Sequence, residues 1–376
     1  METVRYGIIG AGVQGTYYVT KVFDAGKATD ACVSAICDIN PAKIEAIKEK
    51  TTNTDIVYFT DYIEMLESGL CDAVLIEVPH YQHPEMVMEC LKRGIHVICE
   101  KPAGVYAKQV KEMNALAKKS NAKFGMMFNQ RTNCVFRKMR EIVQSGELGE
   151  IQRVTWIITD WFRTQRYYNN GEWRATWSGE GGGVLINQSP HQLDLVQWVV
   201  GKLPKYVNGF CHYGKWHDIE VEDDVTAYFE YDNGATGVFI TTTGETPGTN
   251  RFEIVGTKGK LVCENAHKLY LHKNNVDSQE YIKDATVTHS TVKTEVTEVE
   301  TDGLNPQHSG IINNFTNALL GREELFVEGC DGLAGVELMN AIEFSGWSGG
   351  VKVELPVDED KYLEELNKRI NTSRRK

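Results

Sequence analysis

The sequence lacks the features that direct a protein to nucleic acid or to membranes. Its 376 residues carry a net charge of −12 at pH 7 and contain no long basic block. The clustered Lys and Arg that phosphate backbones require are therefore missing. No apolar run approaches membrane-spanning length, and the N-terminus passes into "VRYGIIG" without the basic start and long apolar core of a signal peptide. We expect a cytoplasmic protein whose partner is a small molecule, with no nucleic acid and no membrane.

Paired cysteines are absent as well. Nine cysteines, an odd number, are scattered mostly through apolar runs without any C-x-x-C pair. This usage predicts free thiols in a reducing compartment, and no metal-binding residues are assigned. The hydrophobic content of 41% and charged content of 24% are those of an ordinary globular protein, and the length suffices for two domains with cores.

A glycine-rich turn follows the first apolar segment. The run "VRYGII" leads into "GAGVQG" at residues 10–15, and a helix-like stretch comes next. This is G-x-G-x-x-G between a strand and a helix, the arrangement that binds a dinucleotide. Gly10 permits the tight turn, Gly12 lets the backbone approach the pyrophosphate, and Gly15 lets the helix pack close to the strand. The alternative is a purely structural glycine turn.

A second apolar run supports the nucleotide interpretation. The segment "CVSAICD" ends at Asp38, 23 residues beyond Gly15, where the acid that binds the ribose hydroxyls is expected. The charge of Asp38 would repel a 2′-phosphate, and no arginine follows it. NAD is therefore favoured over NADP as the cofactor.

Short apolar runs then alternate with amphipathic segments up to "KFGMMF". This alternation predicts an α/β fold with a doubly wound parallel sheet, whose ligands bind beyond the C-terminal ends of the strands. Lys101, in "CEKP", follows the fifth strand and would reach the nicotinamide end of the cofactor. There the positive ring and partial burial favour its neutral form. A solvated surface lysine is the alternative.

The pattern changes after about residue 130. Alternating stretches such as "VTAYFEY" and "TGVFITTT", joined by "DNG" and "TKG", predict an α+β domain with a large open, mostly antiparallel sheet. The uncovered face of such a sheet favours self-association, so we expect a homodimer or homotetramer. The expected divisions are residues 1–128 for NAD, residues 129–356 for substrate and oligomerisation, and residues 357–376 as a charged C-terminal helix or tail.

Aromatic residues and arginines concentrate between residues 151 and 177, which hold seven aromatics and four arginines. Aromatic faces and bidentate arginines suit a sugar ring with an anionic or heavily hydroxylated part. Trp161, Arg163 and Tyr168 are therefore candidate substrate contacts. Packing onto the sheet or a subunit interface is the alternative for each of them.

One stretch, "GEGGGVLINQSPHQLDL", places four glycines just before an amphipathic run. Because glycine costs conformational entropy, the pattern indicates a site rather than a plain connection. Ser189, Pro190 and Gln192 predict a capping box at a helix start. His191 then lies in the first turn, where the positive helix end favours a neutral ring that can accept a proton. Asp194, three residues on, is placed to orient it, and a structural histidine is the alternative.

The sequence resembles the glucose-fructose oxidoreductase, inositol dehydrogenase and MocA (Gfo/Idh/MocA) family over nearly its whole length. The resemblance is carried by "GIIGAGVQG", "CDIN", "VPHYQHPEMVMECLKRGIHVICEKP", "GGGVLINQSPHQLDLVQWVVG" and "FEIVGTKGKLV". It implies a Rossmann domain and reversible NAD(P)-dependent oxidation of a secondary hydroxyl on a sugar or polyol. By position, Lys101 would hydrogen-bond the reacting hydroxyl and His191 would be the general acid/base. The cofactor-binding residues expected are Gly10, Gly12, Val13, Gln14, Gly15, Asp38, Pro79, His83, Glu100 and Lys101.

Two positions depart from the family pattern. Asn187 stands where the family usually has an aspartate, and we count it with Lys101 and His191 as a catalytic and substrate-binding candidate. An amide can hydrogen-bond substrate or histidine, but it cannot stabilise an imidazolium by charge or relay a proton. The usual proline-asparagine after the fourth strand is changed to Pro79-His80.

Two other classes of function stay open at this point. One is a redox-neutral enzyme that oxidises its substrate transiently to a ketone, eliminates a group or inverts a centre, and then returns the hydride from tightly retained NAD. The other is a non-catalytic sensor of NAD or sugar on the same scaffold. The presence of both Lys101 and His191 argues against the sensor.

Overall fold

The computed structural model describes residues 2–171 and 173–374, and the chain divides into two compact units. The first division falls after residue 132, and the domain boundaries expected from sequence stay a prediction. A later segment of the chain, Pro306–Val336, also belongs to the first unit, and no local sequence pattern predicts this. Unit 1 comprises Met1–Thr132 and Pro306–Val336, and unit 2 comprises Asn133–Asn305 and Glu337–Lys376.

Unit 1 is built on a parallel sheet. Within the described residues six strands lie in the order β3-β2-β1-β4-β5-β6, which is the order of a doubly wound dinucleotide-binding fold. All five strand pairs are parallel, and the expected α/β class is confirmed. The strands are β1 (Val4–Ile9), β2 (Ala31–Cys37), β3 (Val57–Phe59), β4 (Ala73–Ile76), β5 (His96–Cys99) and β6 (Phe124–Met126).

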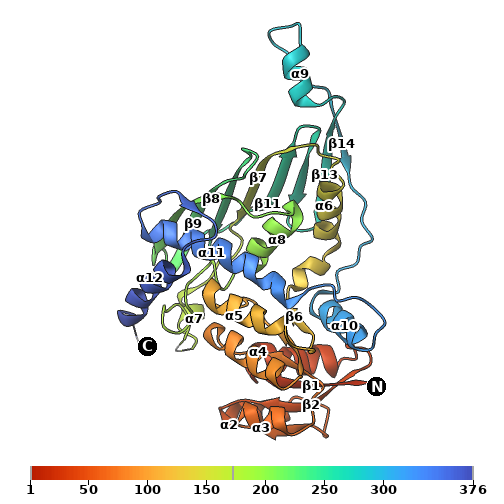
Figure 1. Ribbon diagram of the computed structural model, residues 1–376, viewed down its shortest axis with the longest axis vertical. Coiled ribbons are helices and arrows are strands. Elements are labelled where there is room, and N and C mark those ends of the chain that lie inside the picture. The colour runs from red at the N-terminus through yellow and green to blue at the C-terminus, as the bar shows by residue number, and fades with distance from the viewer. Residues whose placement is uncertain (1, 172, 375–376) are drawn as a thin grey trace. The chain divides into compact units, whose positions relative to one another are not determined.

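Helices follow the strands of unit 1 as the alternating pattern predicts, and α4 and α5 pack beside each other (Figure 1). Asn40 and Asp61 cap α2 and α3 with their side chains. The Tyr6 hydroxyl hydrogen-bonds Thr316 at 2.8 Å, which joins α10 to β1. The helices are α1 (Val13–Tyr17), the π-helix η1 (Tyr18–Phe23), α2 (Pro41–Lys48), α3 (Tyr62–Glu67), η2 (His80–Gln82), α4 (His83–Lys92), α5 (Ala107–Ala117), η3 (Asn129–Thr132), α10 (Gln307–Leu319) and η4 (Gly329–Asp331).

Unit 2 contains the expected open sheet. In the described part of the chain nine strands lie in the order β14-β13-β12-β11-β7-β10-β9-β8-β15. Neighbouring strands are antiparallel except for β7 and β10, which are parallel. The strands are β7 (Ile151–Ile158), β8 (Tyr206–Tyr213), β9 (Glu222–Glu230), β10 (Thr236–Thr242), β11 (Asn250–Gly256), β12 (Gly259–Glu264), β13 (Lys268–Asn274), β14 (Thr294–Glu298) and β15 (Val353–Glu354).

The core of unit 2 lies on one face of this sheet. Trp156 stacks on Phe252 with ring centroids 4.2 Å apart, and Phe136 packs against it at 5.7 Å. Alternate side chains of a strand share a face, so β7 and β11 bring these rings together. At the far edge of the sheet, β14 and α9 project outward (Figure 1), and no residue of either is buried. The helices are α6 (Cys134–Gln144), α7 (Gln165–Tyr168), α8 (Pro190–Val200), α9 (Ser278–Asp284), α11 (Gly332–Trp347), which crosses the boundary between the units, and α12 (Glu359–Asn371).

All nine cysteines lie in the described part of the chain and carry free thiols. Among the residues placed by the structure, no helix is both long and apolar enough to cross a membrane. The same residues include no group of three or more His, Cys, Asp or Glu side chains arranged to hold a metal ion.

Candidate functional site

The glycine turn after β1 has the geometry of a pyrophosphate cradle. Gly10 has a φ of +105°, and a Cβ there would lie 2.2 Å from the Glu77 carbonyl oxygen. A Cβ on Gly15 would lie 1.9 Å from the Gly10 carbonyl oxygen. A Cβ on Gly12 would meet nothing within 4 Å. Gly10 and Gly15 are therefore required by packing, whereas at Gly12 the backbone faces open space, as close approach of a ligand requires.

Asp38 lies beside this cradle, directly after β2. It is only 7% exposed. The Ala11 N–H donates to its Oδ2 and the Asn40 N–H to its Oδ1, both at 2.9 Å. Lys43 Nζ is 3.6 Å from Oδ2. The carboxylate is thus fixed at the edge of the glycine turn, and these residues fit the ribose and pyrophosphate of NAD.

The strand end after β5 holds Glu100 and Lys101. Glu100 is 9% exposed and accepts a hydrogen bond from the Tyr18 hydroxyl at 2.6 Å. The Lys101 N–H donates to the other oxygen of Glu100 at 3.1 Å. Burial raises the pKa of Tyr18 well above its usual value. Glu100 therefore joins the lysine-bearing turn to the helix that follows the glycine cradle.

Glu77 and His308 complete this cluster, and the sequence interpretation missed both together with Tyr18. Both Glu77 carboxyl oxygens are buried without a hydrogen-bond partner among the described residues. Burial, and then Glu100, raises the pKa of Glu77 well above its ordinary value. The ring of His308, on α10, lies 5.6 Å from that of Tyr18. The strand-end rule applied to "DAVLIEVP" includes Glu77, but no local signal identifies His308.

Val13, Gln14, Pro79 and His83 are the other expected cofactor residues, and Gln14 is the second residue of α1. Val13, the first residue of α1, is 87% exposed. Pro79 precedes η2 as its N-cap. The ring nitrogens of the buried His83 face the Pro102 carbonyl at 2.7 Å and the Val78 carbonyl at 2.8 Å. His83 therefore links the turns that follow β4 and β5, and burial lowers its pKa.

The glycine-rich segment of unit 2 lies on the start of β9. Glu222 Oε1 accepts hydrogen bonds from the Gly183 N–H at 2.8 Å and the Leu185 N–H at 3.1 Å. A Cβ on Gly183 would lie 2.0 Å from the Glu222 carbonyl oxygen, and one on Gly182 would lie 2.9 Å from Glu343 Oε1. Glycine is thus required here because backbone packs against backbone and buried carboxyl groups.

His191 occupies the second position of α8, after Pro190, and is 9% exposed. The predicted capping box is wrong. Ser189 makes no side-chain cap bond, because its hydroxyl instead hydrogen-bonds Thr241 on β10 at 2.9 Å. The Asp194 carboxylate accepts a hydrogen bond from Gln197 at 3.1 Å. Its role in orienting His191 stays a prediction.

Asn187 belongs to a hydrogen-bonded network in the same unit. Its Nδ2 donates to Glu180 Oε1, and its Oδ1 accepts from the Tyr167 hydroxyl at 3.3 Å and from Gln188 Nε2 at 3.2 Å. Arg174 Nη1 donates to the Tyr167 hydroxyl at 2.8 Å. Glu180 and Tyr167 were not singled out from sequence, where they are one carboxylate and one aromatic residue among many.

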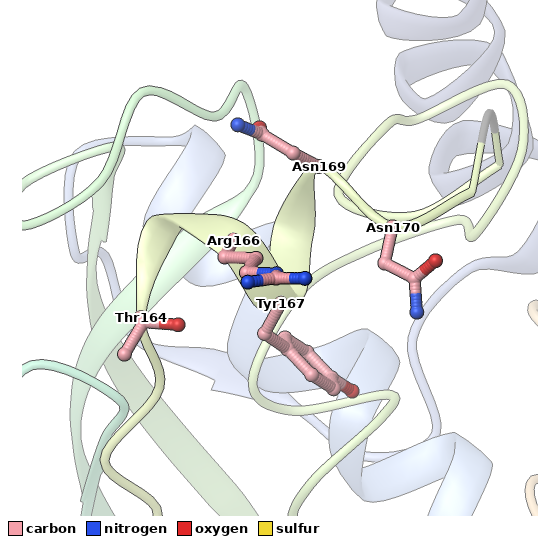
Figure 2. Close-up of a pocket in the computed structure, with 5 residues that line it drawn as sticks. All are labelled: Thr164, Arg166, Tyr167, Asn169 and Asn170. Carbon is pink, nitrogen blue, oxygen red and sulfur yellow. The ribbon is translucent and has the colours of Figure 1, made fainter.

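The candidate substrate residues lie near this network. Tyr168 is 2% exposed, and its hydroxyl donates to Thr243 at 2.8 Å. Trp161 Nε1 is a buried donor without a hydrogen-bond partner among the described residues, and the Arg163 guanidinium lies 5.8 Å from the Trp161 ring. The neighbouring Tyr167 faces a cavity of about 430 Å³ (Figure 2). The residues that line this cavity are Thr164, Arg166, Tyr167, Asn169 and Asn170.

Two family models match the chain. The model of an oxidoreductase family with an NAD-binding Rossmann fold matches residues 4–128. The model of the Gfo/Idh/MocA C-terminal domain matches residues 136–262. These are the regions that contain, respectively, the glycine cradle with Lys101 and the glycine-rich segment with His191.

Individual proteins resemble the chain over much of its length. Inositol 2-dehydrogenase of Rhizobium meliloti (strain 1021) is 26% identical over 343 residues, which cover 90% of this chain and 96% of that protein. D-glucoside 3-dehydrogenase of Escherichia coli (strain K12) is 30% identical over 252 residues, 61% of this chain and 68% of the relative. The WlbA dehydrogenase of Bordetella pertussis, solved with NADH and UDP-GlcNAcA, matches with a TM-score of 0.80 and 25% identity over 95% of this chain and 99% of that chain.

Proposed function

The chain belongs to the Gfo/Idh/MocA oxidoreductase family, and from this premise we propose that it oxidises a secondary hydroxyl of a sugar, polyol or sugar derivative, reversibly and with NAD. The relatives named for their substrates act on inositol and on glucosides. NAD, when bound, supplies the hydride acceptor. The protein itself must bind the cofactor, orient the carbinol and move its proton.

In this proposal the glycine cradle and Asp38 bind the cofactor. Gly12 leaves open space for the pyrophosphate, and Asp38 lies one hydrogen bond from Ala11 in the same turn. A fixed carboxylate accepts hydrogen bonds from both ribose hydroxyls and repels a 2′-phosphate. These two features favour NAD over NADP.

We assign the binding and deprotonation of the reacting hydroxyl to three residues, Lys101, His191 and Asn187. Lys101 follows β5 at the strand edge that also bears Gly10 and Asp38, the edge at which ligands of such sheets bind. We assign to Lys101 the hydrogen bond to the reacting hydroxyl and to His191 the acceptance of its proton. Asn187 hydrogen-bonds the substrate or the histidine. The placement of Lys101 is the observation that supports this assignment most directly.

The distal part of the substrate is assigned to the aromatic and arginine segment of unit 2. Trp161 offers a buried N–H without a partner in the described residues, and Arg163 lies against its ring. The cavity beside Tyr167 carries a guanidinium, two amides and a hydroxyl, which suit hydroxyl or anionic groups of a sugar. Tyr168 is buried, and its ring packs against that of Tyr167 with the centroids 5.1 Å apart.

A direct assay tests the function. The protein is incubated with NAD and a panel of polyols, aldoses, glycosides and sugar acids while the absorbance of NADH is followed. We expect at least one panel member to yield NADH. Lys101→Met should lower kcat about a hundredfold or more, whereas Lys92→Met, on the exposed face of α4, should leave it unchanged. Turnover of no panel member, turnover without net NADH, or full activity of Lys101→Met would contradict the proposal.

A further inference from the structure

Glu180 is a buried carboxylate within the loop that bears Asn187, one of the candidate catalytic residues. It is 2% exposed, and it lies seven residues before Asn187, between α7 and α8. One of its oxygens accepts the Ala175 N–H, and the other accepts Asn187 Nδ2. Arg174 Nη1 lies 3.8 Å away. A buried charge requires partners of this kind, so the site supplies donors to both carboxylate oxygens.

The contact with Glu180 determines how the Asn187 amide is oriented. With Nδ2 toward the carboxylate, Oδ1 accepts hydrogen bonds from Tyr167 and Gln188. The reversed amide would place its oxygen against the carboxylate and its NH2 group against the NH2 group of Gln188, and these pairs repel. The charge of Glu180 therefore selects one of the two amide orientations.

The network continues from Asn187 to the cavity. The Tyr167 hydroxyl donates to Asn187 and accepts from Arg174 at 2.8 Å and from Gln188 at 3.2 Å. Its ring lies 4.8 Å from the Arg174 guanidinium, and the same side chain lines the cavity in Figure 2. A chain of hydrogen bonds thus connects the buried carboxylate to a side chain that lines the cavity.

Strain in the backbone accompanies this arrangement. Ala175 has a φ of 55°, a left-handed conformation that a residue with a Cβ rarely adopts, and its N–H is the donor to Glu180. Non-glycine residues persist in this region only when their surroundings hold them there, and such positions concentrate at functional sites.

We propose that Glu180 is a positioning residue, which supplies through Asn187 the negative charge that position 187 itself lacks. This inference rests on the proposed function, because Asn187 is one of its catalytic candidates. The carboxylate at position 180 holds the amide at 187, and the amide holds the Tyr167 hydroxyl and Gln188. The carboxylate and the amide form a pair whose two groups can be exchanged with the hydrogen bonds to Ala175, Tyr167 and Gln188 retained.

Three variants test the pair. Glu180→Gln leaves one carboxylate oxygen replaced by an NH2 group, so either the Ala175 bond is lost or the Asn187 amide turns over. We expect kcat to fall about tenfold to a hundredfold, with KM changed about threefold or less, since the misplacement affects orientation more than binding. Asn187→Asp places two carboxylates in contact and should lower kcat similarly, because both cannot be ionised.

The decisive test compares the kcat of the double variant Glu180→Gln/Asn187→Asp with the kcat of each single variant. The introduced glutamine accepts the Ala175 N–H and donates to the introduced aspartate, which accepts from Tyr167 and Gln188. Each of these four hydrogen bonds has a counterpart in the double variant, while the charge moves from position 180 to position 187. We expect kcat above that of either single variant, a result that a merely structural role in independent contacts would not produce.

Glu354→Gln, which alters an exposed carboxylate on β15, is the matched control and should retain the native kcat. Thermal unfolding identifies any variant that does not fold. If Glu180→Gln is unstable, the kcat of the double variant is compared with that of Asn187→Asp instead. Native kcat in Glu180→Gln, or losses in the double variant equal to the product of the single losses, would overturn this inference alone. Absence of activity in the native protein would overturn the proposed function together with it.

Discussion

Replacing Glu222 with glutamine is expected to stabilise unit 2 above neutral pH. Glu222 lies at the start of β9, 1% exposed, beneath the glycine-rich segment. Its Oε1 is satisfied by the N–H groups of Gly183 and Leu185, whereas its Oε2 is buried without a hydrogen-bond partner in the described residues. Glu343 is also buried, and its pKa is raised first by burial and then by the charge of Glu222. A glutamine keeps the accepting oxygen and removes the charge.

The size of the effect follows from the pKa of Glu222, which burial raises from 4.5 to about 7. Because this value is higher in the folded than in the unfolded chain, the folded state binds the extra proton between pH 4.5 and 7. The free energy of unfolding therefore falls as the pH rises through that window. A difference of this size corresponds to about 3 kcal/mol at pH 8, lost progressively from pH 4.5 upward.

Urea unfolding of the native protein and of Glu222→Gln at intervals from pH 5 to pH 8 measures this contribution. The variant should gain about 2.5 kcal/mol relative to the native protein between pH 5 and pH 8, because a small part of the loss has already occurred at pH 5. The absolute difference depends also on the buried NH2 group, which costs about 1–3 kcal/mol if it finds no acceptor. Glu354→Gln, with its exposed side chain, should show no such change. Two parallel curves for the native protein and Glu222→Gln would refute the reasoning.

Three further substitutions test the backbone and the nucleotide site. Gly183→Ala should lower the free energy of unfolding by about 1–3 kcal/mol, since its Cβ would lie 2.0 Å from the Glu222 carbonyl oxygen; unchanged urea unfolding would contradict this. Gly12→Ala should leave the melting temperature unchanged but raise the Kd for NAD about tenfold or more, because the methyl group enters space left for the ligand. A stable variant with native Kd in a fluorescence titration would argue against the cradle. Asp38→Ser should reduce the preference for NAD over NADP about tenfold, with Lys43 left to attract the 2′-phosphate, and an unchanged ratio of the two Kd values would exclude Asp38 as the discriminating group.

The sheet of unit 1 could be predicted from sequence because its determinants are local. β4 is an unbroken apolar segment, all four of its residues being buried, and apolar runs of this kind are typical of parallel strands covered on both faces. Gly10 and Asp38 follow a strand directly and Lys101 lies two residues after one, so the order of elements alone places them at one edge. The contact of Tyr6 with Thr316 spans 310 residues. No local pattern encodes it, and the assignment of α10 to unit 1 required the structure.

The network around Asn187 could not be predicted for a different reason. A carboxylate seven residues away has no fixed relation to an amide across a loop, because loops lack the periodicity that places side chains on helices and strands. The predicted capping box is wrong because a tertiary contact, which the local sequence does not encode, is present instead. Its sequence was present, but Thr241 on β10 offers the Ser189 hydroxyl a tertiary partner at 2.9 Å, and that contact replaced the local one.

The glycines that precede His191 have a role opposite to the one their composition suggests. A glycine-rich sequence is typical of a mobile connection, yet the backbone here is buried and bonded to Glu222 through two N–H groups. A side chain at Gly182 would meet the carboxyl group of Glu343, and one at Gly183 would meet the backbone carbonyl of Glu222. The glycines therefore permit close packing, which fixes the segment bearing Asn187 and His191. If Glu180 positions Asn187 as we propose, the placement of these two residues depends on the buried carboxyls at positions 180 and 222, and a change in the charge of either carboxyl would alter the geometry of the candidate site.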